Sequence, residues 1–478
     1  MIRRPSIRTA LVRLAALAAL ALAAACGGAR PPEPPRISET DADPEGSHAA
    51  AVAAAVKPYL DAELLSGLVV GLYDAGRREI YGFGKGPGPG PGGVAPDGGS
   101  LFELGTATRV YTGLLLADAI QRREIDPDAE VASYLPPGVT VPTRDKAAIT
   151  VRHLALHGSG LPPLPPSLAQ ASGADPFRGY DEDRLYRDLN RTELVAAPGT
   201  AIQPSSYGTA LLGLAIGRKA GPGYARALET RILAPLELRD TALAVPPGAA
   251  ARRMAGTDDD LAAAPGWSWG ALAPAGGLVS SARDQLRLLE AELDAAAGGK
   301  NLPLRGPMRL TQEPQLEETG AGGDNLGLGW MIDGAGRLWQ GGGSGGFRAF
   351  LALDPKQKRA VVVLASTASP VIDRLGRALL ALLDDPKAAA WTPPTPAQLA
   401  AYAGTYDFAG QQLAMVAAGR RIYLQVPNEP RVRLLPVSDH EFWIEPLQAV
   451  AMFQQEGGKI ARVVFGVGAR QIAAPRVE

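Results

Sequence analysis

The sequence has few side chains that can hold a metal ion or form a covalent cross-link. Its single cysteine is Cys26, so no disulfide can form within the chain. Four histidines are present, and the sequence contains neither an H-E-x-x-H pattern nor an aspartate-rich calcium loop. We therefore expect no metal centre, and no pattern in the sequence indicates another cofactor.

Excess charge of one sign and long apolar runs are also lacking. The chain has 478 residues, with 48 basic and 49 acidic side chains and a formal net charge of -1. This balance lacks the basic surface that nucleic-acid binding requires, so we expect no nucleic-acid partner. Beyond the N-terminus, no run approaches the ~18 uninterrupted apolar residues of a membrane-spanning helix. The composition is that of an ordinary globular protein with room for more than one domain.

The N-terminal 25 residues have the pattern of a secretory signal peptide. Arginines from Arg3 to Arg13 precede an apolar run, Leu14 to Ala25, which is about half the length of a membrane-spanning helix. The run ends in small residues directly before Cys26, which resembles a bacterial lipoprotein signal whose cysteine is lipidated. The other interpretation is an ordinary signal peptide, with Cys26 an incidental thiol. We expect an exported protein that is lipid-anchored in the bacterial cell envelope, in the outer membrane and periplasm or at the cell surface.

Composition and turn residues divide the chain into five parts. The prolines between Arg30 and Glu45 lie in a segment too polar to fold alone, and Trp391 to Pro396 marks a second composition break. Beyond this break, short alternating runs recur about every ten residues, which is typical of a small all-β domain. We predict a signal peptide (1–25), a proline-rich tether (26–48), a main domain (49–388), a linker (389–398) and a small all-β domain, a sandwich or a β-barrel (399–478).

The main domain has strand patterns near both of its ends. A helical pattern from Ala49 to Leu65 precedes compact apolar runs at Gly67–Tyr73 and Glu79–Phe83. Two more strand patterns come late, at Phe347–Leu353 and Ala360–Ala365. The long region between them mixes short helices with proline-rich loops. One sheet built from both ends of a domain is an α+β pattern.

Six segments of the main domain follow one another in an order typical of one enzyme family: Phe102–Gly105, Ile149–Pro162, Pro198–Thr200 with Leu211–Ile216, Ala275–Asp284, Leu326–Trp330 and Gly341–Phe347. They resemble the corresponding segments of the β-lactamase-related serine hydrolases. This family includes class C β-lactamases, D-Ala-D-Ala carboxypeptidases and penicillin-binding proteins. The resemblance covers residues 50–385, and it implies an antiparallel sheet flanked by helices, with a helical subdomain. Residues 399–467 resemble the small lipocalin-like β-domain that often follows this scaffold.

The first catalytic motif that this resemblance implies is altered. Acyl transfer in the family needs a serine and a lysine three residues apart on one helix face. At that position this sequence reads Thr106-Ala107-Thr108-Arg109. Threonine keeps the hydroxyl, but its extra methyl group stiffens the side chain and crowds the attack. Arginine is the larger change, because its guanidinium stays protonated and cannot serve as a base.

The other two motifs of the family are altered as well. The Tyr-x-Asn motif aligns with Pro204-Ser205-Ser206, which has neither the phenol nor the amide. The Lys/His-x-Gly motif aligns with Gln340-Gly341-Gly342, whose neutral amide cannot carry protons at neutral pH. Every general base of the family is therefore lost. The degenerate catalytic positions are Thr106, Arg109, Ser206 and Gln340.

The backbone of the pocket does not depend on these side chains. The resemblance assigns the two oxyanion-hole donors to Thr106 N and Gly343 N. Ser205, Tyr207 and Gly342 are expected in the cleft wall as candidate binding residues. Tyr207 either replaces the missing phenol or is a surface or packing tyrosine, and we favour the second interpretation.

Three further side chains allow more than one interpretation. Ser344 lies in a G-x-S-x-G pattern, but a strand rather than a helix follows it, which favours a hairpin turn over a nucleophile. His157 lies in a segment that is structural in the family, so we interpret it as a hydrogen-bonded scaffold residue. Arg109 either forms an ion pair in the lysine's place or binds a carboxylate, such as a peptide C-terminus.

We therefore predict an exported lipoprotein of this family that is a pseudoenzyme and binds a peptide, ester or cell-wall-type ligand. Its contact with the membrane is expected through the lipid anchor alone. Two alternatives remain open: a weak esterase or peptidase that acts through Thr106, and a non-enzymatic interaction protein.

Overall fold

The structure, a computed structural model, describes most of the chain beyond the predicted tether. It covers residues 46–477, apart from 75, 87–94, 170, 172, 300–301, 317–323, 386–390, 445–446, 448 and 468–469. The predicted signal peptide, Cys26 and most of the predicted tether lie outside the described residues. Within the part of the chain that is described, no helix is both long and apolar enough to cross a membrane.

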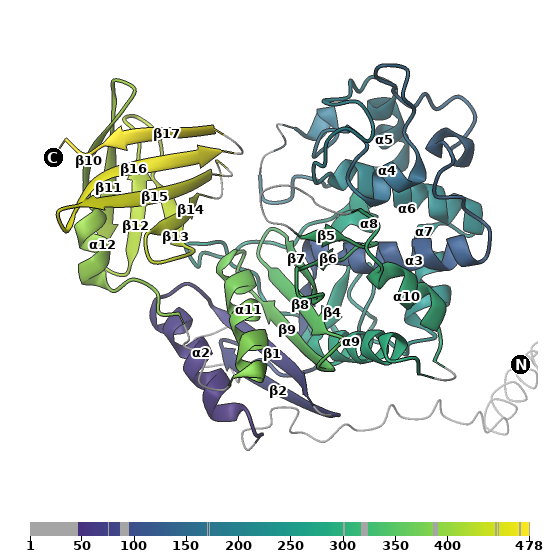
Figure 1. Cartoon of the computed structure of the whole chain (residues 1–478), viewed down its shortest axis with the longest axis horizontal. Coiled ribbons are helices and arrows are strands. Elements are labelled where there is room, and N and C mark those ends of the chain that lie inside the picture. Colours follow the sequence, from purple (N-terminus) through teal and green to yellow (C-terminus); the bar gives the residue numbers. More distant parts are fainter. Residues whose placement is uncertain are drawn as a thin grey trace, which may run out of the picture. The chain divides into compact units, whose positions relative to one another are not determined.

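A seven-stranded antiparallel sheet forms the centre of the first domain (Figure 1). Its strands are β1 (Gly67–Asp74), β2 (Arg77–Gly84), β5 (Asn325–Leu326), β6 (Met331–Ile332), β7 (Leu338–Gly343), β8 (Arg348–Asp354) and β9 (Arg359–Ala365). They lie in the order β2-β1-β9-β8-β7-β6-β5. Because β1 pairs with β9, with Leu68 opposite Ala365, the start and the end of the domain lie side by side. The prediction of one sheet from both ends of the domain is confirmed.

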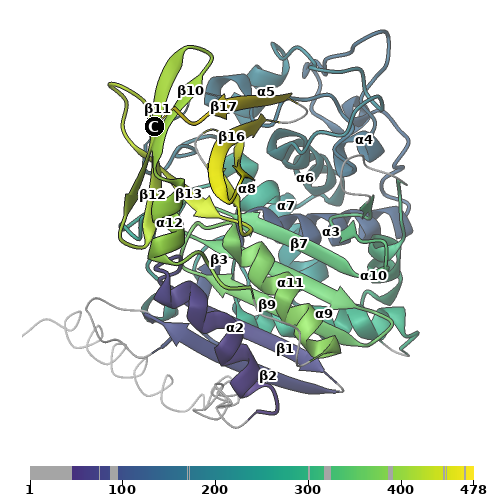
Figure 2. The same ribbon diagram turned by 60° about the vertical axis from the view of Figure 1, so that its left-hand side comes forward.

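Helices cover both faces of this sheet, because its central strands are apolar on both sides. Val361 of β9 packs into a core with α2 (Ala49–Asp61) and α11 (Val371–Asp384). The next residue, Val362, points the other way and joins the larger core that contains α9 (Ala282–Ala296). Figure 2 shows α2 and α11 in front of the same face of the sheet.

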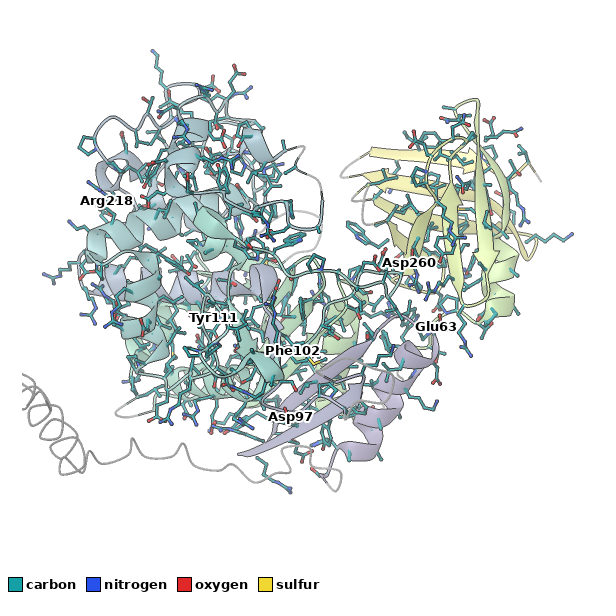
Figure 3. The ribbon with its side chains drawn as sticks, turned by 180° about the vertical axis from the view of Figure 1, so that it is seen from behind. Glu63, Asp97, Phe102, Tyr111, Arg218 and Asp260 are labelled. Atoms are coloured by element: carbon teal, nitrogen blue, oxygen red, sulfur yellow. The ribbon has the colours of Figure 1, made fainter. Side chains whose placement is uncertain are left out.

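The chain between β2 and β5 forms a largely helical subdomain. Phe102 and Tyr111 lie in its interior (Figure 3), and Tyr111 OH accepts a hydrogen bond from Gln285 Nε2 at 2.6 Å. Its longer helices are α3 (Arg109–Gln121), α5 (Glu182–Leu189), α6 (Ser206–Ala220) and α10 (Arg305–Gln312), and its shorter ones are α4 (Val151–Ala155), α7 (Tyr224–Leu228) and α8 (Ala273–Gly276). Two short strands, β3 (Leu101–Glu103) and β4 (Val279–Ser281), pair beside the 3₁₀ turn η1 (Gly105–Thr108).

The C-terminal domain is one eight-stranded antiparallel sheet, with its strands in sequence order. It follows α12 (Pro396–Tyr402), whose first turn is capped by the side chain of Thr395. A bridge between Tyr406 and Arg476 joins its first strand to the residue after its last strand, so the sheet nearly closes into a barrel. The predicted all-β domain is confirmed. Its strands are β10 (Gly404–Phe408), β11 (Gln411–Ala418), β12 (Arg421–Gln425), β13 (Val432–Pro436), β14 (Glu441–Ile444), β15 (Ala449–Glu456), β16 (Lys459–Val467) and β17 (Arg470–Pro475).

Two arginines of the C-terminal sheet contact the first domain. Arg433 is 3% exposed, and its Nη2 donates to Glu63 O at 3.1 Å. Arg421 donates to the carboxylates of Glu63 at 3.1 Å and Asp260 at 3.3 Å, and both acids are labelled in Figure 3. The contact between the C-terminal sheet and the first domain therefore includes the buried Arg433 and the half-buried Arg421. It also includes apolar packing, because Leu435 joins the core that contains α2 and α11.

Two local predictions were wrong. The helix predicted to continue to Leu65 ends at Asp61, because Glu63 adopts a left-handed backbone with a φ of 55°. The glycines Gly341 to Gly343, expected in a turn, form the last residues of β7, so the turn begins after them.

Candidate active site

The first motif lies in a turn that is held against β7 by close backbone contact. The η1 turn leads from β3 directly into α3. Gly105 in this turn has a φ of 50°, and a side chain there would collide with the backbone of Gly343. A side chain on Gly342 would collide with Ala107 N. Glycine is therefore needed on both sides of this contact, at Gly105 and at Gly342.

Thr106 is half-buried, and its hydroxyl has no base beside it. Thr106 Oγ1 donates a hydrogen bond to Gly341 O at 3.4 Å, its one hydrogen bond within the part of the chain described. An activated nucleophile passes this proton to a base. A backbone carbonyl cannot take the proton up, so the hydroxyl is in place but nothing activates it.

The backbone groups of the predicted oxyanion hole lie on segments that touch. Thr106 follows Gly105, whose backbone contacts Gly343. Gly343 ends β7 opposite Arg348 of β8. This proximity supports the assignment of Thr106 N and Gly343 N as oxyanion donors, which stays a prediction.

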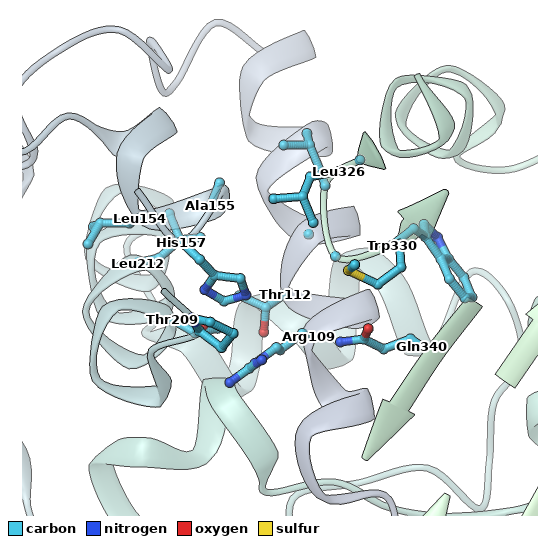
Figure 4. A pocket seen from close by; sticks show the side chains of 16 residues that line it. Arg109, Thr112, Leu154, Ala155, His157, Thr209, Leu212, Leu326, Trp330 and Gln340 are labelled. Atoms are coloured by element: carbon cyan, nitrogen blue, oxygen red, sulfur yellow. The ribbon is translucent and has the colours of Figure 1, made fainter. Parts of the chain in front are cut away.

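Arg109 points from the start of α3 into a cavity of about 80 Å³ (Figure 4). Its Nη2 donates to Ser206 Oγ at 3.3 Å, and its buried Nε has no hydrogen-bond partner among the residues that the structure describes. Among the described residues, no acidic side chain forms an ion pair with Arg109. The ion pair expected as one alternative is thus not found there. The cavity is lined by Arg109, Thr112, Gly113, Leu154, Ala155, His157, Pro204, Thr209, Leu212, Leu326, Gly327, Leu328, Gly329, Trp330, Met331 and Gln340.

His157 lines the same cavity and is held in its neutral form. Burial, and then the charge of Arg109, lower the pKa of His157 to about 3. Burial also lowers the pKa of Arg109, to about 10, so the guanidinium remains charged at neutral pH. Ser205 N donates to His157 Nδ1 at 3.5 Å, which agrees with the predicted scaffold role. A histidine with so low a pKa is a poor general base near pH 7.

Gln340 and Pro204 bring the other two altered motifs to this cavity. Gln340 is 8% exposed on β7, and its amide faces the cavity in Figure 4. Pro204 lies directly before Ser205, the N-cap residue of α6. Ser205 Oγ accepts a hydrogen bond from Gly208 N at 2.9 Å, which caps the helix. The structure therefore gathers one position of each motif around a single space, and none of the three side chains can take up a proton.

Tyr207 points away from this cavity. It is fully buried, and its hydroxyl lies 3.4 Å from Leu185 O and 3.4 Å from Thr192 Oγ1. Burial raises the pKa of Tyr207 above its ordinary value. This placement favours the packing interpretation over a substitute phenol.

Ser344 lies in the connection between β7 and β8, where the hairpin interpretation places it. Ser344 N donates to Phe347 O at 3.0 Å, and the buried Ser344 Oγ has no hydrogen-bond partner. Strand β8 begins soon afterwards, at Arg348, so no helix follows this serine. The G-x-S-x-G pattern is part of a β-hairpin here.

A larger groove, of about 1120 Å³, was not predicted, and none of Thr106 to Arg109 lines it. Its lining includes Glu103, which ends β3, and Phe347, which follows the turn after β7. Glu103 forms an ion pair with Arg253 at 2.8 Å and accepts a hydrogen bond from Trp267 N at 3.2 Å. These residues come from distant parts of the sequence, so no local pattern reveals the groove.

Some lining residues of the Arg109 cavity could have been found from the sequence. Thr112 and Gly113 follow Arg109 by three and four residues on α3, so helical spacing puts them on the same helix face as Arg109. Trp330 reaches the cavity from the segment between β5 and β6, which only the tertiary fold determines. Across the described ranges, no cluster of three or more His, Cys, Asp or Glu side chains is placed to hold a metal ion.

Comparisons with known proteins agree with this architecture. A family model described as Beta-lactamase matches residues 52–385. The chain is similar to the D-alanyl-D-alanine-carboxypeptidase/endopeptidase AmpH of Escherichia coli (strain K12), at 26% identity over 317 residues, 64% of this chain and 80% of that protein. It is 27% identical to penicillin-binding protein 4 of Amycolatopsis lactamdurans over 344 residues, 66% of this chain and 87% of that protein. A β-lactamase of Escherichia coli (strain K12) is 27% identical over 192 residues, 40% of this chain and 47% of that protein.

Proposed function

Since the chain belongs to the β-lactamase family, we propose that it is a member that has lost acyl transfer and keeps a ligand-binding cleft. One observation carries this proposal: the cavity that gathers the three motifs contains no side chain able to accept a proton at neutral pH. Its two titratable groups are Arg109, which stays charged, and His157, whose pKa burial and Arg109 lower to about 3.

Loss of the base has a large effect on this chemistry. General-base assistance contributes ~10²–10⁴-fold to such reactions, and groups that act together lose more when all are removed. Thr106 Oγ1 keeps its position but donates to a backbone carbonyl, Gly341 O. Acylation of Thr106 is therefore slowed to a rate that gives no useful turnover.

The loss of the general base does not remove the backbone donors and the groove that can bind a ligand. The backbone donors at Thr106 and Gly343 do not depend on side chains. The groove of about 1120 Å³ offers space for a peptide or a cell-wall fragment, with the ion pair of Glu103 and Arg253 in its wall. Two similar proteins are named as a D-alanyl-D-alanine carboxypeptidase and a penicillin-binding protein, which makes D-alanine-terminated peptides the first ligands to test.

We also propose that the protein is exported and lipid-anchored at Cys26 in the cell envelope. The support is the sequence pattern: the chain's one cysteine stands directly after the small residues that end the signal-like apolar run. Metabolic labelling with an alkyne fatty acid tests this. The wild type is expected to carry the label and Cys26→Ala to lack it, and equal labelling of both would refute the anchor.

Binding and labelling of the purified mature protein test the proposed function together. Calorimetry with a D-alanine-terminated peptide is expected to show saturable binding that Arg109→Met weakens and Arg218→Met, an exposed control (Figure 3), leaves unchanged. A fluorophosphonate reagent is expected to leave the protein unlabelled. Labelling that Thr106→Ala abolishes would instead establish a weak esterase or peptidase. If the protein shows neither binding nor labelling, the remaining interpretation is an interaction protein with a vestigial cleft.

A further inference from the structure

We infer that the cavity beside Arg109 is a binding site for one small monovalent anion, the size of a halide ion or a carboxylate group. The inference goes beyond the proposed function, because it needs no peptide in the larger groove. It rests on three properties of the cavity: a half-buried arginine without a counter-charge, a set of hydrogen-bond donors without acids, and a small volume.

The charge of Arg109 is not neutralised within the part of the chain that the structure describes. Its only hydrogen bond there is from Nη2 to Ser206 Oγ at 3.3 Å, and a hydroxyl carries no compensating charge. Its Nε is buried without a partner. A buried ion that lacks a counter-charge is strongly unfavourable, and a buried N–H without an acceptor adds to that cost. An anion in the cavity would supply both the charge and the acceptor.

The side chains around this space are donors. Ser205 N donates to His157 Nδ1, so the proton of the neutral ring is on Nε2, where it can be donated to a ligand. The amide of Gln340 supplies a further donor from β7. The cavity lining includes no aspartate or glutamate. Figure 4 shows Arg109, His157 and Gln340 around the same space, each from a different segment of the fold.

The volume and the walls of the cavity determine which anions it can bind. A cavity of about 80 Å³ is several times the ~10–15 Å³ that one water molecule needs on the same measure, so it has room for a small group of atoms. A halide ion or the carboxylate group of a longer ligand fits this space. Leu154, Leu212 and Trp330 form apolar walls, and a low-dielectric surrounding strengthens the attraction between Arg109 and an anion.

Thermal unfolding of the mature protein tests the site, with sodium bromide compared with sodium gluconate at equal ionic strength. An anion that binds only the folded state raises Tm in a saturable way. Gluconate is the control because its carboxylate is attached to a chain of hydroxyl groups, whose burial against Leu154, Leu212 and Trp330 is unfavourable. We expect bromide to raise the Tm of the wild type by several degrees relative to gluconate. Crystals grown in bromide are expected to show one anomalous-scattering peak in the cavity.

Three variants separate this site from general salt effects. Arg109→Met is expected to abolish the difference between bromide and gluconate, and the exposed Arg218→Met is expected to keep it. Gln340→Glu places a carboxylate inside the cavity, so it is expected to remove the bromide effect while remaining as stable as the wild type in gluconate. This variant keeps the test decisive if Arg109→Met does not fold.

The outcomes also distinguish the two sources of the anion. If a D-alanine-terminated peptide displaces bromide, the carboxylate of the ligand uses the site; if bromide stays, the site belongs to a free small anion. The inference is overturned if the wild type shows no bromide effect, or if Arg109→Met shows the same effect. Labelling of Thr106 by a fluorophosphonate would reject the proposed function and leave the bromide result intact.

Discussion

Arg109 and His157 line one cavity, and the charge of Arg109 acts with burial to hold the pKa of His157 at about 3. The two residues come from α3 and from the loop after α4, and neither has an acidic partner in the lining of the cavity. This relationship explains why a histidine beside the former catalytic centre does not replace the lost bases. It also makes the protonation of His157 a direct measure of the charge at Arg109.

Arg109→Met is expected to raise the pKa of His157 toward its ordinary value of 6.5, without reaching it. Removing the guanidinium removes the repulsion between two positive charges, while burial, the larger cause, remains. NMR titration of histidine-labelled protein measures this shift. Only four histidines contribute signals, and His48 and His440 serve as internal references. An unchanged pKa of His157 in Arg109→Met would show that the two side chains do not interact.

Gly342→Ala is expected to destabilise the fold by about 1–3 kcal/mol, as overpacking of a close contact does. The added methyl group would collide with Ala107 N and Leu104 O, which separates β7 from the η1 turn. Chemical denaturation measures the loss. Gly334→Ala is the control, because nothing lies within 4 Å of the added methyl group there. Equal effects of the two changes would mean that β7 and η1 are not in close contact.

Glu292 is expected to make the stability of the protein fall as the pH rises. Burial raises the pKa of Glu292 from 4.5 to about 8, against the opposing effect of a hydrogen bond from Gln312 Nε2 at 2.6 Å. A group whose pKa is higher in the folded state stabilises fully below pH 4.5, and its contribution is lost as the pH rises through about 8. The free energy of unfolding of the wild type therefore declines across this window.

Glu292→Gln is expected to remove that decline. The variant should match the wild type near pH 4.5 and exceed it above pH 8 by up to a few kcal/mol, an order-of-magnitude value. Urea unfolding at several pH values measures the difference. Glu441→Gln, at an exposed position, is expected to follow the wild type at every pH. A Glu292→Gln variant that keeps the wild-type slope would show that Glu292 is not buried in its neutral form.

Tyr207→Phe is expected to leave ligand binding unchanged and to lower stability by about 1 kcal/mol or less. The hydroxyl makes two long contacts, both at 3.4 Å, and neither reaches the Arg109 cavity. Calorimetry and denaturation measure the two effects. Loss of peptide binding in this variant would mean that Tyr207 turns into the cleft as a substitute phenol.

The sheet and the barrel could be predicted because each rests on local patterns. The runs at Phe347–Leu353 and Ala360–Ala365 are apolar enough to be recognised as buried strands, and they correspond to β8 and β9. Strand β7 was harder, because three glycines at its end have low strand propensity. The glycine at Gly342 is explained by the close approach of η1, a contact between residues more than 200 positions apart.

The altered motif positions could be predicted as a set, but their surroundings could not. Sequence patterns identified Arg109 and Gln340 without showing that they share a cavity with His157. The packing between α3, α6 and β7 determines whether Arg109 has an acidic neighbour. It also determines the direction in which the Tyr207 side chain points. Sequence spacing carries no information on such contacts, because they depend on how distant elements meet.

Loss of the base is tested most directly by the intact mass of the mature protein after incubation with benzylpenicillin. The wild type is expected to keep its mass, because Thr106 has no group to take its proton. A stoichiometric gain of one benzylpenicillin, mapped to Thr106 and absent from Thr106→Ala, would contradict the loss of acyl transfer.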